Sequence, residues 1–360
     1  MAFPRSRAIT AFAALALAGC KAQPPPVPMW ESESPLAALP RAPLGIAADF
    51  TSLPFQVTPE KVRLGRWLFY DRRLSADGTV SCGDCHRPLN AFSEPEPRST
   101  GVGGGRGARK SPTFVNGAFR IYPVYFWDGR AASLVEQAKG PMVNPVEMAN
   151  THERVVDTVA GLPGYRTVFR RAFGDDRIDI DRVAEAIAAY EATRLSGNSA
   201  YDRYDTGKVN ALTAQQELGR DLFFGKAACN GCHLGQNFTD SRFHNLGVGW
   251  VEPPRGADPR TGFKDPGRAA VSGDPGDTGK FKTPTLRDCT RHAPYMHDGS
   301  MTTLRQVVLH YAKGGNRNPW LDEAMKPLDL SDVEVAALVA FLSALEGEGY
   351  QDAAPATFPD

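Results

Sequence analysis

One short motif occurs twice in this chain, and it constrains the fold more than any other feature. Residues 82–86 read CGDCH and residues 229–233 read CNGCH. The pattern C-x-x-C-H attaches a c-type haem, because the two thiols add to the porphyrin and the adjacent histidine then lies under the iron. A zinc site or a dithiol redox pair would need only C-x-x-C, so the repeated histidine favours haem. The predicted attachment residues are Cys82, Cys85, Cys229 and Cys232, and the predicted proximal ligands are His86 and His233.

Charge and composition indicate a globular protein without a nucleic-acid partner. The chain has 41 basic and 41 acidic residues, so no excess of positive charge is available to bind phosphates. Hydrophobic residues make up 42% of the 360 residues, which is typical of soluble globular domains. The 29 prolines and 35 glycines predict long ordered loops between helices.

The first residues look like a targeting segment. Arg5 and Arg7 precede an apolar run at 9–18, which is too short to span a bilayer. The sequence LAGC at 17–20 resembles a bacterial lipoprotein cleavage box, which predicts a signal peptide at 1–19 and a lipid on Cys20. An ordinary secretory peptide, or a cytosolic chain with an unusual start, is the alternative.

The lipid implies a location. Residues 20–50 form the expected linker, with a semi-rigid Pro-rich tether at 23–28. Haem attachment to C-x-x-C-H occurs outside the bacterial inner membrane, so both signals predict a periplasm-facing protein held by its lipid anchor only. Lys21 follows the cysteine, where an aspartate would signal inner-membrane retention, so we expect the outer membrane.

The chain contains an internal duplication. The sequences LGRWLF at 64–69 and LGRDLF at 218–223 each precede a haem motif, and each follows a helix-start signal at Thr58 or Thr213. Similar pairs follow the two motifs: SPT and TPT at 111–113 and 283–285, and WDGR and HDGS at 127–130 and 297–300. Two related haem units in tandem are therefore predicted.

The predicted fold is mainly α, with two tandem cytochrome c-like haem domains and long ordered loops. Few segments alternate with the period of a strand, whereas apolar residues recur at helical spacing in 181–195 and after the capping box at Ser331 and Glu334. We expect an N-terminal haem domain at 51–200, a C-terminal haem domain at 201–350 and a tail at 351–360. Cys289 has no place in either motif and is predicted to be a buried, inert thiol.

Together with the two motifs, FWDGRA at 126–131 and PYMHDGS at 294–300 resemble the bacterial di-haem cytochrome c peroxidase superfamily, which includes the MauG-like enzymes. The resemblance covers residues 53–346. It implies that the haem on His86 reacts with hydrogen peroxide and that the haem on His233 is six-coordinate and passes electrons. Trp127 matches a tryptophan between the two haems, although a core aromatic would look the same.

The resemblance also implies a peroxide site. Glu147 matches the family's distal glutamate, which moves a proton between the two peroxide oxygens. Gln137 matches a distal amide, and Pro141 matches a residue packed over the vacant face of the iron. Taken without the resemblance, each of the three would be read as a surface or turn residue.

Two departures from the typical pattern point to the MauG-like branch. Typical relatives have a histidine in the loop after the first motif, but residues 87–110 contain none, and Val102 lies near the expected position. The peroxidatic iron should then be open without prior reduction. Tyr311 stands where relatives have an axial methionine, and a tyrosinate ligand lowers the reduction potential. The alternative sixth ligands are His310, Met296 and Met301.

A third departure concerns the exit for oxidising equivalents. MauG has a surface tryptophan six residues before its second proximal histidine, whereas this chain has Ala227. Trp250 and Trp320 are alternative exits, or they are structural.

The family also holds a calcium ion between its haem units. The matching donors would be the side chain of Asn116 and the backbone carbonyls of His292 and Pro294.

Three functions follow from these residues. The first is a MauG-like peroxidase or oxidase that shares oxidising equivalents between two haems and oxidises a partner protein. The second is a conventional peroxidase that removes hydrogen peroxide with electrons from a small cytochrome. The third is a non-enzymatic electron carrier, which Glu147 and the missing loop histidine argue against because a carrier favours two capped irons.

Overall fold

The computed structural model describes Met1, residues 27–119 and residues 124–360, so the leader and Cys20 lie outside the described residues. The described parts are mainly helical, as predicted, and their only sheet has two strands of two residues each, β1 (Phe243–His244) and β2 (Phe281–Lys282), paired antiparallel. None of the described helices is both long and apolar enough to cross a membrane. The α-helices are α1 (Met29–Ser32), α2 (Pro59–Tyr70), α3 (Cys82–Cys85), α4 (Leu134–Val143), α5 (His152–Gly161), α6 (Pro163–Phe173), α7 (Ile180–Ala192), α8 (Ala200–Asp205), α9 (Ala214–Phe224), α10 (Ala269–Ser272), α11 (Leu304–Ala312) and α12 (Asp332–Ser343).

The helix starts agree with the capping signals in the sequence. The Thr58 side chain accepts a hydrogen bond from the backbone N–H of Lys61 at 3.2 Å, and Pro59 opens α2. Thr213 forms the predicted capping box at the start of α9, and Ser331 forms the one at the start of α12. The helix predicted at 181–195 is α7, which begins one residue earlier and ends at Ala192.

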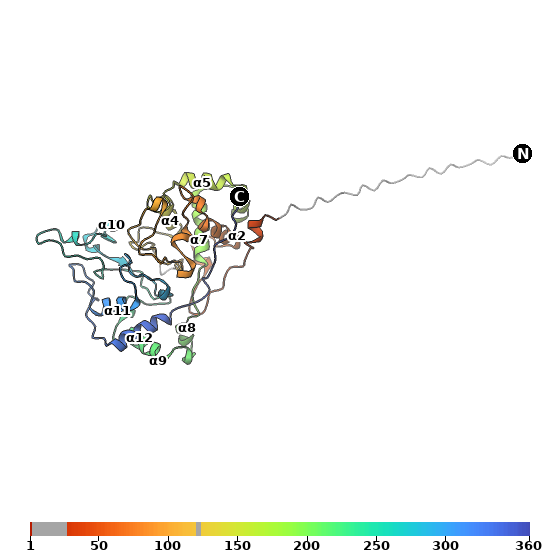
Figure 1. Ribbon diagram of the computed structural model, residues 1–360. Helices are drawn as coiled ribbons and strands as arrows, with labels where there is room; N and C mark the ends of the chain where they lie inside the picture. Colours follow the sequence, from red (N-terminus) through yellow and green to blue (C-terminus); the bar gives the residue numbers. More distant parts are fainter. Residues whose placement is uncertain (2–26, 120–123) are drawn as a thin grey trace.

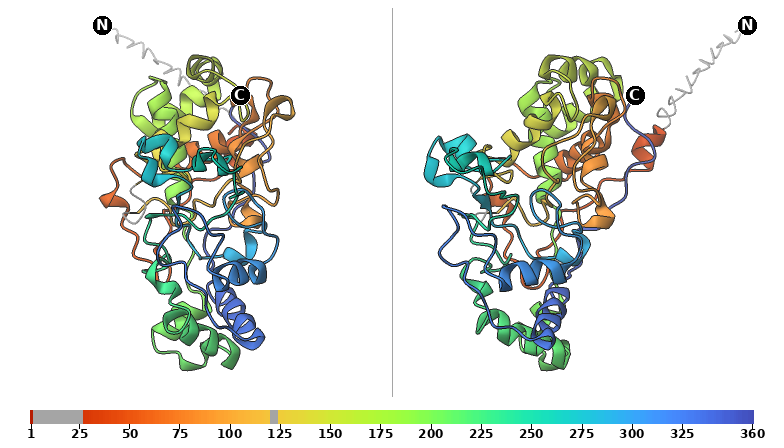
Figure 2. Two further views of the ribbon diagram at one scale, coloured as in Figure 1. Left: turned by 90° about the vertical axis from the view of Figure 1, so that its left-hand side faces the viewer. Right: turned by 60° about the vertical axis from the view of Figure 1, so that its left-hand side comes forward.

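The sequence repeat corresponds to two similar helix pairs. α2 packs along α7, and α9 packs along α12; Figures 1 and 2 show the pairs at opposite ends of the molecule. Gly65 of α2 lies against the backbone of α7, where a Cβ would overlap the carbonyl oxygen of Ala186. Gly219 of α9 lies in the same way against Ala337 of α12. The glycine of each LGR sequence therefore lets the two backbones approach closely.

Each helix pair belongs to its own hydrophobic core, and we call these cores the first and second units. The first unit includes Trp67, Phe69 and Tyr190, whereas the second unit includes Phe223 and Phe341. Cys289 is buried in the second unit, and burial raises the pKa of its thiol to about 12, so the prediction of a buried thiol is confirmed.

Both end segments of the described chain pack on the first unit. Trp30 is buried there, and its indole N–H donates to the carboxylate of Asp360 at 3.0 Å. Tyr350 also belongs to this core, although it follows the whole second unit in the sequence. Figures 1 and 2 accordingly show the C-terminus beside the first-unit helices.

Candidate haem centres

A single cavity of about 1190 Å³ reaches both C-x-x-C-H motifs. Its wall is mostly apolar, as expected for a site that takes a porphyrin. None of the four motif cysteines is in a disulfide, so all four thiols are available for thioether bonds. The structure places nearly all the predicted site residues on this wall: Cys82, Cys85, His86, Trp127, Gln137, Pro141, Glu147, Cys229, Cys232, His233, His292, Pro294 and Tyr311. Asn116 is buried but is not part of the wall.

The two motif histidines are held in the same way. The Nδ1 of His86 lies 2.9 Å from the carbonyl oxygen of Phe92, and the Nδ1 of His233 lies 3.0 Å from that of Phe238. A carbonyl can only accept, so Nδ1 carries the hydrogen and Nε2 keeps its lone pair. Burial lowers the pKa of both imidazoles and keeps them neutral. Both side chains are therefore prepared to bind a haem iron through Nε2.

Gln137 and Pro141 belong to α4, and Glu147 lies in the turn that follows this helix. All three residues line the cavity. The side-chain amide of Asn144 donates to the Glu147 carboxylate at 2.8 Å and orients it. Burial raises the pKa of this carboxyl. The nearby charge of Arg130 opposes this effect only in part, so the pKa stays above the ordinary 4.5. A buried, oriented carboxyl of this kind is suited to receive a proton and to return it.

The glycine-rich loop after the first motif rests against Glu147 rather than in the cavity. The backbone N–H of Val102 donates to the Glu147 carbonyl at 2.8 Å, and the Val102 side chain packs against the first-unit core. A Cβ on Gly101 would overlap the backbone at Val146. No residue from 100 to 106 lines the cavity; Ser99 and residues 107–110 of the same loop do, and none of them is a histidine.

Trp127 is hydrogen-bonded to a segment that follows the first haem motif and to a strand that follows the second. Its indole N–H donates to the carbonyl of Lys110 at 2.8 Å, and its own carbonyl accepts from the backbone N–H of Lys282 in β2 at 2.8 Å. Trp127 also lines the cavity. The bond to Lys110 therefore orients the side chain, and the bond from Lys282 ties its backbone to β2.

Near the second motif, Tyr311 of α11 lines the cavity, and burial raises the pKa of its phenol. His310 points elsewhere, because its Nε2 lies 2.9 Å from the carbonyl of Leu246. Met301 is absent from the wall, whereas Met296 lines it. The structure adds Met325, a wall residue that no sequence pattern had indicated.

The sequence did not indicate three charged residues of the cavity wall, Lys110, Lys282 and Glu191. Burial lowers the pKa of Lys110 and of Lys282 to about 8, and it raises the pKa of Glu191 to about 8. Haem carries two propionates, and an anion of this kind suits a wall with one buried lysine, Lys110, and one half-buried lysine, Lys282. These residues stand in no motif, so only their common place on the wall reveals them.

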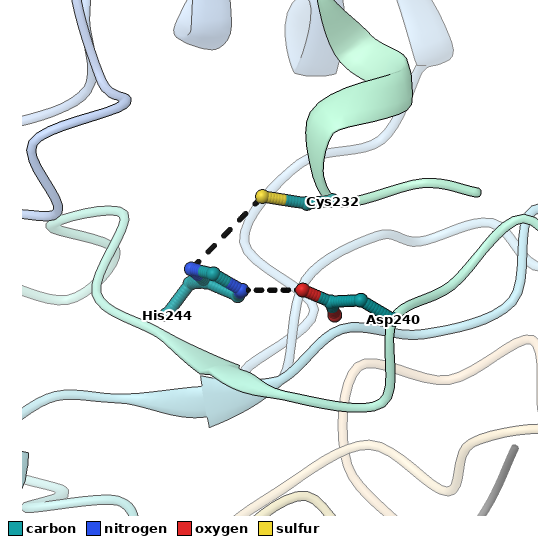
Figure 3. Close-up of side chains that lie close together, drawn as sticks. All are labelled: Cys232, Asp240 and His244. Atoms are coloured by element: carbon teal, nitrogen blue, oxygen red, sulfur yellow. Dashed lines mark hydrogen bonds and ion pairs between the residues drawn. The ribbon is translucent and has the colours of Figure 1, made fainter.

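A charged cluster lies beside the second motif (Figure 3). His244 is close to Cys232, Asp240 and Asp322, and hydrogen bonds to the Cys232 sulfur, to Asp322 and to Asp240 raise the pKa of its imidazole to about 10. Cys232, Asp240 and His244 together resemble a metal-ligand set. The Cys232 thiol is required for haem attachment, however, and each nitrogen of His244 faces a different carboxylate, so the cluster does not suit a metal ion.

Comparison with known proteins agrees with this geometry. A family model described as di-haem cytochrome c peroxidase matches residues 59–210. The methylamine utilization protein MauG of Methylorubrum extorquens is 40% identical over 294 residues, which cover 81% of this chain and 80% of that protein. This chain belongs to the di-haem cytochrome c peroxidase family.

Other relatives support the same assignment. The cytochrome c551 peroxidase of Nitrosomonas europaea is 37% identical over 299 residues, covering 81% of this chain and 82% of that protein. The crystal structure of a MauG-like protein associated with microbial copper homeostasis superposes with a TM-score of 0.76 at 30% identity, covering 90% of this chain and 98% of that one. As a member of the di-haem peroxidase family, the protein is a peroxidase-type oxidoreductase with two c-type haems.

Proposed function

We propose that this di-haem peroxidase is a MauG-like enzyme that reacts with hydrogen peroxide at the His86 haem and passes oxidising equivalents to the His233 haem and to a partner protein. The observation that carries this proposal is the place of Glu147 on the cavity wall, beside a loop that contains no histidine. The relatives named MauG and the MauG-like crystal structure support it.

A haem bound at His86 would supply an iron that binds hydrogen peroxide and, together with the second haem, the two electrons that reduce the peroxide to water; the partner protein would later return these two electrons. The residues of the chain do the rest. The Glu147 carboxylate receives the proton of the inner peroxide oxygen and delivers it to the outer oxygen, which then leaves as water. Pro141 and the surrounding apolar wall limit access of water, and Trp127 provides an aromatic side chain between the units.

EPR and optical spectra of the diferric holoenzyme, recorded before and after one equivalent of hydrogen peroxide without reductant, test the proposal. We expect one high-spin and one low-spin ferric haem, and an immediate, long-lived oxidised species after peroxide. Two low-spin haems that stay inert until one electron is added would contradict it. Steady turnover with reduced cytochrome c would then favour the conventional peroxidase, as the relationship to cytochrome c551 peroxidase allows.

We further propose Tyr311 as the sixth ligand of the second haem, since it lines the wall while His310 bonds elsewhere. Replacing Tyr311 with methionine should raise the reduction potential of that haem by about 59 mV or more, a tenfold change in its redox equilibrium, because a neutral thioether replaces an anionic oxygen. Spectroelectrochemical titration measures the change. His310→Gln is the control and should leave the low-spin EPR signal unchanged. An unchanged potential in Tyr311→Met would point to Met296 or Met325 instead.

The finer organisation of the chain is also proposed. We infer two tandem haem domains at 51–200 and 201–350, supported by the paired helices and the repeated glycines. We also propose a periplasm-facing protein held at the outer membrane by a lipid on Cys20, supported by the lipoprotein-like sequence at 17–20. Cys20→Ala should release the protein into the soluble periplasmic fraction.

We propose, finally, a calcium ion near Asn116. The Asn116 amide exchanges two hydrogen bonds of 2.9 Å with the backbone of Ser196, which leaves its Oδ1 one free lone pair. The backbone of Ser196 holds the amide, and its buried hydroxyl lies beside the buried Asp288 carboxyl, so further oxygen donors are available near the amide. Removal of calcium with a chelator should alter the haem spectra, and its return should restore them.

A further inference from the structure

His244 lies between two carboxylates next to the second haem motif. Its Nδ1 is 2.6 Å from Asp322 Oδ2, and its Nε2 is 3.0 Å from Asp240 Oδ2. A carboxylate oxygen only accepts, so each ring nitrogen must carry a hydrogen and the ring is an imidazolium. We call Asp240, His244 and Asp322 the triad. One cation between two anions gives the triad a net charge of −1.

The triad is at the edge of the second haem site. His244 Nδ1 is 4.0 Å from the sulfur of Cys232, which would form one of the two thioether bonds (Figure 3). His244 and Asp322 both line the cavity. The backbone N–H of Asp240 donates to the carbonyl of Cys232 at 2.8 Å. The triad therefore lies directly beside a cysteine that would attach the second haem, with the His244 ring 4.0 Å from its sulfur.

The triad also joins segments that are far apart in the sequence. His244 belongs to β1, Asp240 follows the second motif, and Asp322 begins a loop in which Ala324, Met325 and Lys326 line the cavity. The backbone N–H of Asp322 donates to the carbonyl of Asn245 at 3.0 Å, which holds this loop against β1. The ion pairs and this backbone bond thus hold the charged side chains and the loop next to the second haem motif.

Other charged groups lie near the triad. The amino group of Lys280 faces Asp322 and helps to lower the pKa of that carboxyl, but it is paired with Asp277 at 3.1 Å. The contact of Asp240 with Arg242 is through the backbone N–H, not through the guanidinium. Lys326, in the loop that Asp322 begins, and Lys282 of β2 also line the cavity, so the triad's own net charge of −1 lies among these positive side chains.

We propose that Asp240, His244 and Asp322 form a positioning triad whose net negative charge lowers the reduction potential of the second haem. A negative charge close to the iron stabilises the ferric state relative to the ferrous state, because the ferric state has one more positive charge. At an effective dielectric constant of about 20, a unit charge within about 10 Å changes the ferric–ferrous equilibrium roughly tenfold. The triad would thereby help the second haem to hold an oxidising equivalent.

Three variants of the holoenzyme test the charge. Asp322→Asn removes one negative charge and should shift the equilibrium about tenfold towards the ferrous state, equivalent to about 59 mV for one electron. His244→Gln removes the positive charge and should shift it in the opposite direction. Glu323→Gln makes the same charge change as Asp322→Asn at the next, exposed residue and should change it by less than twofold. The measurement is a spectroelectrochemical titration of the low-spin haem.

Opposite shifts in Asp322→Asn and His244→Gln, with Glu323→Gln unchanged, would support the proposal. Shifts in the same direction would overturn it, since mere opening of the loop would expose the haem equally in both variants. No shift, or an equal shift in the control, would overturn it as well. If Asp322→Asn fails to fold with both haems, Asp240→Asn makes the same change on the other side of the ring. The proposal about the triad rests on a second haem at Cys229 and Cys232. If the triad has no effect on the reduction potential, the reaction of the first haem with peroxide would still be observed.

Discussion

Replacing Glu147 with glutamine should slow the reaction with hydrogen peroxide by about 10²–10⁴-fold, the usual contribution of a general acid–base group. Glutamine keeps the shape of the side chain and its contact with Asn144, but it cannot accept the peroxide proton. Stopped-flow absorbance of the diferric enzyme mixed with peroxide gives the second-order rate constant. Glu136→Gln, at an exposed position of α4, is the matched control and should react at the wild-type rate.

The wild-type pH profile provides an independent test of this role. Burial raises the Glu147 pKa above 4.5, so the reactive carboxylate is lost at a higher pH than for an ordinary glutamate. The rate constant should therefore fall as the pH falls through that raised pKa, and Glu147→Gln should lack this acid limb. If Glu147→Gln keeps both the wild-type rate constant and its fall at low pH, another group transfers the proton.

Replacing Gly65 with alanine should destabilise the first unit by about 3 kcal/mol, the upper part of the range for overpacked cores. The added methyl group would overlap the Ala186 carbonyl of α7, and a backbone group cannot move aside as a flexible side chain can. Urea denaturation followed by far-UV circular dichroism and by haem absorbance measures the loss. The same substitution at Gly219 should destabilise the second unit for the same reason.

Gly161→Ala is the control for this prediction. Gly161 is the last residue of α5, and a Cβ there would meet no atom within 4 Å. Alanine is favoured over glycine in a helix by about 0.5–1 kcal/mol, so this variant should be at least as stable as the wild type. Equal stability of Gly65→Ala and Gly161→Ala would show that close packing of α2 on α7 is not needed.

Local signals in the sequence predicted the local features well. The haem motifs depend on residues that are three or four positions apart. Each capping box likewise pairs a residue, Thr213 or Ser331, with the residue three positions later. Such short patterns determine their own geometry, so they could be recognised without a fold. The match of Glu147 and Trp127 to the family depended on spacing, and both residues line the cavity.

Features that depend on distant residues could not be predicted. His244 and Asp322 are 78 positions apart, and no spacing rule connects them. The hydrogen bond from the backbone N–H of Lys282 to the Trp127 carbonyl likewise joins residues that are far apart in the sequence. The sequence also did not show that the Asn116 amide bonds to the Ser196 backbone, because a side-chain amide serves a metal or a turn equally well.

The return of the chain to the first unit has a consequence for the order of assembly. Asp352 accepts hydrogen bonds from Arg66 at 3.0 Å and from Tyr190 at 2.8 Å, and Tyr350 is buried in the same core. The core of the second unit lies within residues 212–345, so its residues are all made before these residues emerge during synthesis. The unit that begins first is thus finished last, and its haem site takes its final shape only after the second unit can already have folded.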